Sequence, residues 1–483
     1  MKNKRGITLI ALVITIIVLL ILAGVSISMI SSQDGILGKV TEAKERDREG
    51  RKIEKTKLSQ MEELITETTT GQIVEQVTDT KPGELERDET DENIYIINSI
   101  EDLVFFAYDV TNGNNYSGKT VKLGKSLDFN STKSYVDPYR TDYGKYGYDG
   151  ELKTLLTSER GFKKIGEETG TDSTKNFGGT FDGNNNSISN LYINRINISK
   201  DFREGLFCIN FGIIKNLKVL NSNLYIENNN NVSSQIGGVS GQNGQTGQIE
   251  SCIASGTIVY KNNGKSGIGG VTGYSSGKII NCKNITRIDV TEDEKMENND
   301  DNSASISIGG ICSGMGANGE ITNSCNFGDI TVINSKVNNI QFGGVVGVGR
   351  GKISNCYNMG ELKVGSNIIA NIGGVIGNNW SNSVNSCYNF GNINVLEGQN
   401  IRKGMLIGKN GVDISKVTNV YYKETEGMTA IGNGNIGDNS TMVLAEDKMR
   451  NNEEFVTLLN QDGNAWKMDT NNINNGYPIL SWQ

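Results

Sequence analysis

A short phrase that recurs through the middle of this chain constrains its fold more than any other feature. Each copy reads aliphatic residue, any residue, small polar residue, and a fourth residue that is apolar or small. The copies begin at Ile188, Ile214, Ile249, Ile279, Ile321, Ile353, Val384 and Val417, at intervals of 26, 35, 30, 42, 32, 31 and 33 residues. Repeats of 20–50 residues are typical of solenoids and propellers.

The residues around each phrase favour a solenoid. Alternating apolar pairs, which indicate strands with one buried face, follow five phrases: Ile258 and Tyr260, Ile288 and Val290, Ile330 and Val332, Leu362 and Val364, Ile393 and Val395. Glycine pairs, which permit positive φ at a corner, precede them at 237–238, 269–270, 309–310, 343–344 and 373–374. Propeller blades need hairpin turns at regular places, which these units lack. We therefore predict an all-β, right-handed parallel β-helix of about eight to ten coils.

The third and fourth positions of the phrase predict a bend and a buried column. Residues three apart face opposite sides of a straight strand, so the chain must turn between the aliphatic residue and the fourth position. The third position is Asn or Ser, which suits a corner. Leu, Val, Ser and Cys interchange at the fourth, so we expect Cys252, Cys282, Cys356 and Cys387 to be buried. Disulfides between stacked cysteines are an alternative to free thiols. Cys325 is expected on the outer side, where it would react first.

Several phrases resemble those of a known family. Gly343–Gly347 reads GGVVG, Gly373–Gly377 reads GGVIG, Asn355–Gly360 reads NCYNMG, and Gly179–Gly183 reads GTFDG. Over residues 160–425 the chain resembles the GLUG-motif repeats of bacterial surface proteins, which occur in adhesins and beside the peptidase of IgA-specific metalloproteases. The resemblance implies the solenoid architecture and carries no catalytic residue.

The N-terminus predicts export. Lys2, Lys4 and Arg5 precede an uncharged, apolar stretch, residues 7–30, that is long enough to cross a bilayer as a helix. The positive-inside rule then places the remainder outside the cell. One interpretation is an uncleaved signal anchor.

The other interpretation is a resemblance to a type IV prepilin leader, carried by residues 4–10, KRGITLI. It implies cleavage between Gly6 and Ile7, and possible pilin-like subunits as partners. Ala11 departs from the family, which has Glu there to pair with a neighbour's N-terminal amine, so the chain would enter filaments as a minor component.

The remaining sequence suggests four regions: a leader and membrane helix at 1–30, a charged helical stalk and linker at 31–92, the β-helix at 93–425, and a C-terminal cap at 426–483. Ile94–Ile97 reads as a strand. Ser99 with Asp102 resembles a capping box that opens a helix over residues 100–110. At the other end, residues 445–460 read as a helix and residues 476–482 as a strand.

Few residues suggest chemistry. The chain has no histidine, which removes the commonest general base and metal ligand, so we expect no cofactor and no metal site. The acidic insert at residues 292–301 lacks the spacing of a calcium loop. The net charge of −8 argues against nucleic acid. Four aromatics near corners could be exposed contacts for sugars or proteins, or could cover the flank of the coils: Tyr274, Tyr357, Trp380 and Tyr388.

These features together predict a non-enzymatic display or adhesion protein, anchored in the membrane through residues 7–30 with its C-terminal domain at the cell surface. The sequence does not identify the extracellular glycan or protein ligand. The alternative is a polysaccharide-active β-helix enzyme, a lyase or glycosidase, which would need clustered carboxylates. Asp182 is expected to have a structural role in a turn.

Overall fold

The computed structural model describes residues 84–129, 160–168, 173–196, 198–228, 232–262, 265–291, 305–333, 339–365, 369–395, 400–436 and 442–483. The chain divides into two compact units, residues 1–60 and 61–483, and the described residues belong to the second. The leader site at Gly6 and Ile7, the membrane helix, most of the stalk and the insert at 292–301 lie outside the described residues. Within those described ranges, no helix is long and apolar enough to cross a bilayer.

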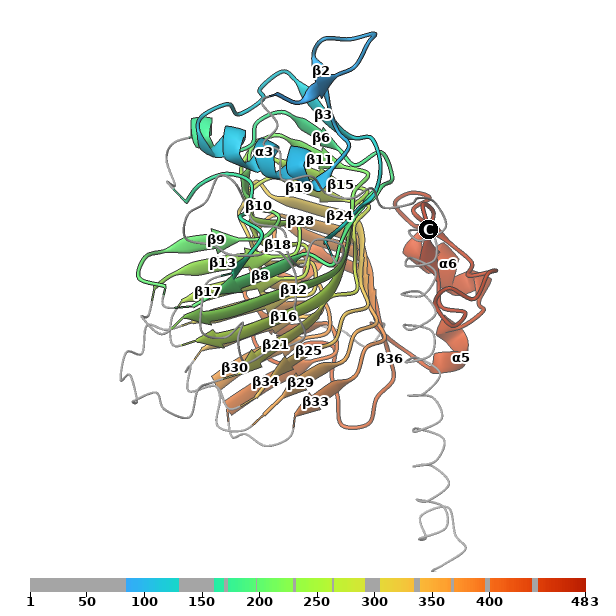
Figure 1. Ribbon diagram of the computed structural model, residues 1–483. Coiled ribbons are helices and arrows are strands. Elements are labelled where there is room, and N and C mark those ends of the chain that lie inside the picture. Colours follow the sequence, from blue (N-terminus) through green and yellow to red (C-terminus); the bar gives the residue numbers. More distant parts are fainter. Residues whose placement is uncertain are drawn as a thin grey trace, which may run out of the picture. The chain divides into compact units, whose positions relative to one another are not determined.

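The middle of the chain is a parallel β-solenoid, as the repeat predicts (Figure 1). Two of its faces are parallel sheets of seven strands each. Sheet B contains β10 (Phe207–Asn210), β14 (Ser240–Asn243), β18 (Thr272–Ser275), β23 (Cys312–Met315), β27 (Val346–Gly349), β31 (Ile376–Asn379) and β35 (Ile407–Asn410). Sheet C contains β9 (Phe202–Glu204), β13 (Ser234–Gly237), β17 (Ser266–Gly269), β22 (Ile306–Gly309), β26 (Ile340–Gly343), β30 (Ile369–Gly373) and β34 (Asn400–Gly404).

The third face, sheet A, holds the repeated phrases and the alternating strands that follow them. Its coil strands are β6 (Thr180–Asp182), β7 (Ser187–Ser189), β8 (Tyr192–Arg195), β11 (Ile213–Lys215), β12 (Lys218–Asn228), β15 (Gln248–Glu250), β16 (Ile253–Asn262), β19 (Lys278–Ile280), β20 (Lys283–Asn284), β21 (Arg287–Thr291), β24 (Glu320–Asn326), β25 (Ile330–Val332), β28 (Lys352–Asn358), β29 (Leu362–Val364), β32 (Ser383–Asn389), β33 (Ile393–Val395) and β36 (Val417–Lys423). All of these coil strands pair in parallel with the equivalent strands of neighbouring coils.

The solenoid has about seven turns, so the prediction of eight to ten coils was too high. One reason is the register of the first phrase. Ile188 pairs with Val219, whereas Ile214 pairs with Phe181. Ile188 therefore lies in the same coil as Phe181, and the interval of 26 residues does not measure a turn. The residues before Phe181 and after β36 mostly form flanking structure.

The bend inside each phrase is confirmed. The third-position residues adopt the left-handed conformation, with φ of 49° to 59° at Asn190, Asn216, Ser251, Asn281, Asn323, Asn355, Ser386 and Asn419. Asn tolerates this region better than other residues with a Cβ, which explains why it dominates the column. Every coil therefore turns at the same place, and the fourth-position side chain points inward.

The glycine pairs have a different role from the one predicted. None of them has positive φ. Instead, a Cβ on Gly270 would lie 2.2 Å from the side chain of Asn284, and a Cβ on Gly344 would lie 2.4 Å from that of Asn358. The glycines leave room for an interior ladder of amides, in which Nδ2 of one Asn donates to Oδ1 of the next over 2.7, 2.8 and 2.9 Å: Asn284, Asn326, Asn358 and Asn389. Close packing, not backbone conformation, requires glycine here.

The cysteines are buried and free, including the predicted column Cys252, Cys282, Cys356 and Cys387. Cys325 pairs with Tyr357 in register, as predicted, but it is also buried. Its outward side is covered by the C-terminal segment, which we define as residues 442–483.

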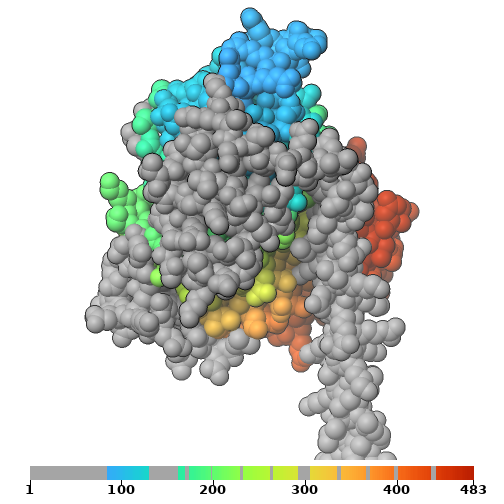
Figure 2. Space-filling model, viewed as in Figure 1, coloured from blue at the N-terminus to red at the C-terminus, as the bar shows by residue number. Residues whose placement is uncertain are grey.

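The front of the solenoid is closed as predicted. After β1 (Glu86–Arg87), β2 (Ile94–Ile97) leads into α3 (Ile100–Thr111), where Ser99 Oγ accepts from Asp102 N over 3.1 Å. β2, β3 (Thr120–Leu123) and β6 then pair successively, and these first residues gather at one end (Figures 1 and 2). Phe106 of α3 packs 5.7 Å from Phe177 and 5.8 Å from Phe181, ring centroid to centroid. The short elements β4 (Leu127–Asp128), β5 (Arg160–Gly161) and η2 (Ser173–Lys175) complete this end.

The predicted cap, residues 426–483, covers the far end only in part: Ile431 bridges Ile407 of the last coil, and β37 (Val443–Leu444) pairs with β36. The rest of the C-terminal segment has another place. It lies along the outer flank of sheet A, where α6 (Glu453–Leu459) contacts β32 and β36 (Figure 1). Trp482 Nε1 donates to the carbonyl of Asn323 over 2.9 Å. Asn323 lies in β24, three coils before β36. The other elements near the C-terminus are η3 (Ile414–Lys416), β37 (Val443–Leu444), α5 (Glu446–Met449), β38 (Trp466–Lys467) and β39 (Ile479–Leu480).

Candidate binding surface

Two of the four aromatics predicted as exposed contacts are buried. Tyr357 and Tyr388 stack at 5.0 Å with an interplanar angle of 8° and have no exposed surface. Trp466 of the C-terminal segment packs 5.8 Å from the first ring and 5.3 Å from the second. These two rings cover the flank of the coils, which is the alternative that the sequence left open, because Trp466, 78 residues beyond Tyr388 and 109 beyond Tyr357, packs over them. They contribute to packing, not to a binding surface.

The other two aromatics lie in or beside sheet B. Trp380 follows β31 and is 46% exposed, and Tyr274 lies in β18 and is partly exposed. Each ring rests on glycine in the next coil. A Cβ on Gly411 would lie 2.5 Å from Cζ3 of Trp380, and one on Gly314 would lie 3.2 Å from Cδ2 of Tyr274. Glycine thus lets each ring lie close to the backbone of the next coil.

The outer row of sheet B, one residue from each coil, contains no carboxylate. In register it reads Ile209, Gln242, Tyr274, Gly314, Val348, Asn378 and Lys409. The outer row of sheet C is also free of carboxylates: Arg203, Gln235, Gly267, Ser307, Gln341, Asn371 and Arg402. The two rows meet at the glycine-pair corner, where Arg203 Nε donates to Gln242 Oε1 over 2.7 Å.

Cations flank Trp380 on both sides. Lys409 Nζ, one coil further on, lies 5.9 Å from the centroid of the indole ring. Arg350 occupies the position equivalent to Trp380 in the preceding coil, since Gly349 pairs with Asn379. We call Arg350, Trp380 and Lys409 the Trp380 patch. The nearest acidic residue along the chain, Asp413, caps η3, where its Oδ1 accepts from Ser415 N over 2.9 Å.

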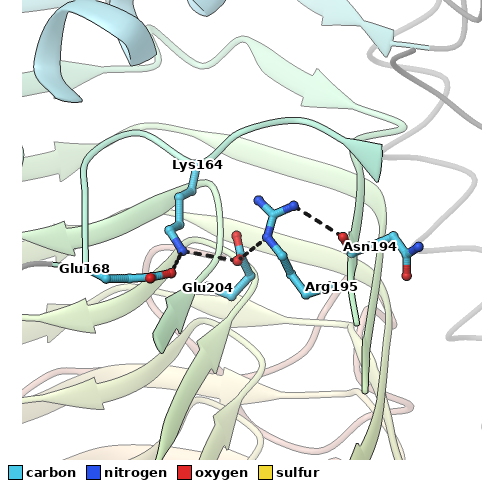
Figure 3. Close-up of polar contacts among 5 residues, drawn as sticks. All are labelled: Lys164, Glu168, Asn194, Arg195 and Glu204. Atoms are coloured by element: carbon cyan, nitrogen blue, oxygen red, sulfur yellow. Dashed lines mark hydrogen bonds and ion pairs between the residues drawn. The ribbon is translucent and has the colours of Figure 1, made fainter. Parts of the chain in front are cut away.

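A buried cluster of charges, which sequence analysis missed, lies near the front of the solenoid (Figure 3). Glu204 has no exposed surface, and its Oε2 lies 3.3 Å from Lys164 Nζ and 2.9 Å from Arg195 Nε. Lys164 also contacts Glu168. Burial lowers the pKa of Lys164, but Glu204, Cys208 and Glu168 raise it, and the net shift is upward. The place of Glu204 in the core follows from its register, since it pairs with Ile236.

Neither the thiol beside this cluster nor the carboxylate of the conspicuous turn is arranged for catalysis. Burial raises the pKa of Cys208 to about 12, so its thiolate is scarce at neutral pH. Asp182 accepts from Asn184 N over 2.9 Å and from Asn216 Nδ2 over 3.1 Å, as expected for a turn residue. Among the residues that the structure describes, no group of three or more Cys, Asp or Glu side chains could hold a metal ion.

No protein-family model and no curated protein sequence matches this chain. One solved structure to which it is similar is that of a Bacteroides ovatus protein described as a putative immunoglobulin A1 protease. The two share 16% sequence identity and a TM-score of 0.41, over 82% of this chain and 94% of that one.

The Trp380 patch combines an exposed aromatic ring with two cations. An aromatic face can stack on the apolar face of a sugar ring, and guanidinium and ammonium groups hold carboxylates. Its position on paired strands keeps these groups at fixed spacings.

Proposed function

We propose that this protein is a non-enzymatic display and adhesion protein of the cell surface. Residues 7–30 anchor it in the membrane, and the solenoid lies outside the cell. The basic residues before an uncharged apolar stretch support this orientation. The resemblance of the repeats to those of bacterial surface proteins supports the role.

The observation that carries the proposal is the exposed indole of Trp380 on a stack of parallel strands, between two cations. Exposed large hydrophobic side chains are few in the described part of the chain: Tyr108, Trp380, Ile436 and Trp482. Trp482 is held by a hydrogen bond to the solenoid, whereas Trp380 is 46% exposed. A rigid surface binds a partner with little loss of conformational freedom.

The first prediction concerns binding. The full-length chain, inserted in nanodiscs, is expected to be retained on an array of glycans and extracellular-matrix proteins, while empty nanodiscs are not. Retention should be measured together with the size of each glycan after overnight incubation. If no ligand is retained, the adhesion role is wrong. If glycans are shortened, the chain is instead the polysaccharide-active enzyme.

The second prediction concerns the N-terminus. We propose that the chain is cut between Gly6 and Ile7 and joins pilin-like assemblies only as a minor component. The intact mass of protein from its native membrane should match a chain that begins at Ile7. Gly6→Val should leave the leader in place, because a side chain there obstructs the scissile bond, and Gly24→Val is the matched control within the apolar stretch. A Gly6→Val chain with the mass of the processed wild type would argue against prepilin processing.

The same argument predicts poor self-assembly. Ala11 supplies no carboxylate for a neighbour's amine, and a buried unpaired amine is costly. Cells that express this chain as their sole pilin-like subunit should therefore show few filaments by electron microscopy. Abundant filaments would contradict this part of the proposal.

A further inference from the structure

We propose that the Trp380 patch binds an acidic polysaccharide, with the indole stacked on a sugar ring and Arg350 and Lys409 beside its carboxylates. This inference rests on the proposed adhesion function and names its ligand class. It follows from the orientation of the indole, the charges around it and the periodicity of the coils.

The indole is held in place before any ligand arrives. The backbone N–H of Trp380 donates to the carbonyl of Gly349 over 2.8 Å, which continues the pairing of β27 with β31. The ring then lies on Gly411, where any other residue would place a Cβ 2.5–2.7 Å from three ring atoms. Part of the ring is thus held against the next coil, and nearly half of the side chain is open to solvent. Such an arrangement suits the flat apolar face of a pyranose ring.

The charge of the patch has the opposite sign to that of the whole chain. The protein has a net charge of −8 at pH 7, yet the outer rows of sheets B and C carry Arg203, Arg402 and Lys409 without one carboxylate. Across the residues that the structure describes, no carboxylate forms an ion pair with Arg350 or Lys409. A neutral sugar would leave these cations unused, whereas a uronic acid would pair with them. Charge complementarity therefore favours an acidic ligand.

The periodicity of the solenoid favours a linear polymer over a folded partner. Arg350, Trp380 and Lys409 come from three successive coils, which are spaced about 4.8 Å apart along the stack. A chain lying parallel to the stack axis can meet all three. A protein interface needs a larger apolar core than one indole. An anionic membrane gains only about 1 kcal/mol per cation, so two or three cations would hold it weakly.

Binding can be tested with the full-length chain in nanodiscs of neutral lipid, with polygalacturonate as the acidic probe. Methyl-esterified polygalacturonate is the matched neutral probe, since it keeps the sugar and removes the charge. We expect the dissociation constant of the acidic probe to be at least about tenfold lower than that of the ester. The difference between the two constants should become smaller as the salt concentration increases. Equal binding of the two probes would overturn the inference.

Variants locate the site. Trp380→Ala should weaken binding at least about tenfold, and Trp380→Phe should retain part of it, because a smaller ring still stacks. The double variant Arg350→Ala, Lys409→Ala should weaken binding of the acidic probe and leave binding of the ester unchanged. Lys363→Ala removes a cation from sheet A and should have no effect. Thermal melting of each variant distinguishes loss of contact from loss of fold, and unaltered binding by folded Trp380→Ala would overturn the assignment.

The outcomes separate this inference from the proposed function. If the array retains the wild type on neutral glycans or on proteins but polygalacturonate does not bind, the inference fails and adhesion stands. If anionic lipid vesicles bind and polygalacturonate does not, the patch is a membrane contact and the inference is wrong. If the array retains nothing, the proposed function fails as well.

Discussion

Replacing Glu204 with alanine is expected to lower the free energy of unfolding by about 3–5 kcal/mol, because the change leaves buried cations without their carboxylate. Lys164 and Arg195 lie within 3.3 Å and 2.9 Å of Glu204 and are themselves almost fully buried. Chemical denaturation followed by circular dichroism measures the effect. Glu320→Gln is the matched control, since the Glu320–Lys352 pair is partly exposed and should contribute about 0–1 kcal/mol.

A second set of variants tests whether the lost charge of Glu204 causes the loss of stability. Glu204→Gln should destabilise the protein substantially even though it preserves the shape of the side chain. Replacing Glu204, Lys164 and Arg195 together with Met should recover much of the loss, because well-packed apolar residues can replace a buried ion cluster. If Glu204→Ala is no worse than Glu320→Gln, the cluster is solvated and its assigned role is wrong.

The charge cluster also predicts how the free energy of unfolding depends on pH. The pKa of Lys164 is raised in the folded chain, so the folded chain holds this proton more tightly than the unfolded chain does. Its contribution to stability is therefore complete below the ordinary lysine pKa of 10.5 and declines as the pH rises beyond it. The difference in unfolding free energy between wild type and Lys164→Met should be constant across neutral pH and change only in the alkaline range.

Removing the C-terminal segment is expected to convert Cys325 from an inert thiol to a reactive one. In the intact protein Gln483 Nε2 lies 3.5 Å from Cys325 Sγ, and burial raises the pKa of Cys325 to about 12. None of the seven cysteines should therefore react with iodoacetamide at pH 8 in the native chain, because all are buried. A chain that ends at residue 441 should be labelled at Cys325 first, as mapped by mass spectrometry.

Two controls give this result its meaning. Cys325→Ser in the shortened chain should abolish the fast labelling. Trp482→Ala in the full-length chain removes the hydrogen bond to Asn323 and should give a smaller increase, which tests the contact without a large deletion. Labelling of Cys356 or Cys387 ahead of Cys325 would show that truncation opens the core instead of uncovering the flank.

Local repetition explains why much of the fold could be predicted. A phrase with an aliphatic residue, a polar corner residue and an inward fourth residue specifies a bend that Asn adopts readily, and every coil repeats it. Stacking such units in parallel is then the way to bury Ile249, Cys252 and Ile258 in line with their equivalents. The strand at Ile94–Ile97 and the Ser99 cap were equally predictable, because each depends on neighbours within a few residues.

Contacts between distant parts of the chain determine which of the remaining side chains are buried. The sequence left open whether Tyr388 is exposed. In the structure it is buried, and its hydroxyl donates a hydrogen bond over 2.6 Å to the backbone carbonyl of Pro478, 90 residues away. No sequence pattern singled out Glu204, whose register with Ile236 places it in the core beside Lys164. Trp380 is 46% exposed, and the C-terminal segment packs instead over Tyr357 and Tyr388. The repeat determines how each coil bends, but burial of its outer face depends on which surface the non-repeating segment packs against. That choice rests on long-range packing, which leaves no periodic signal in the sequence.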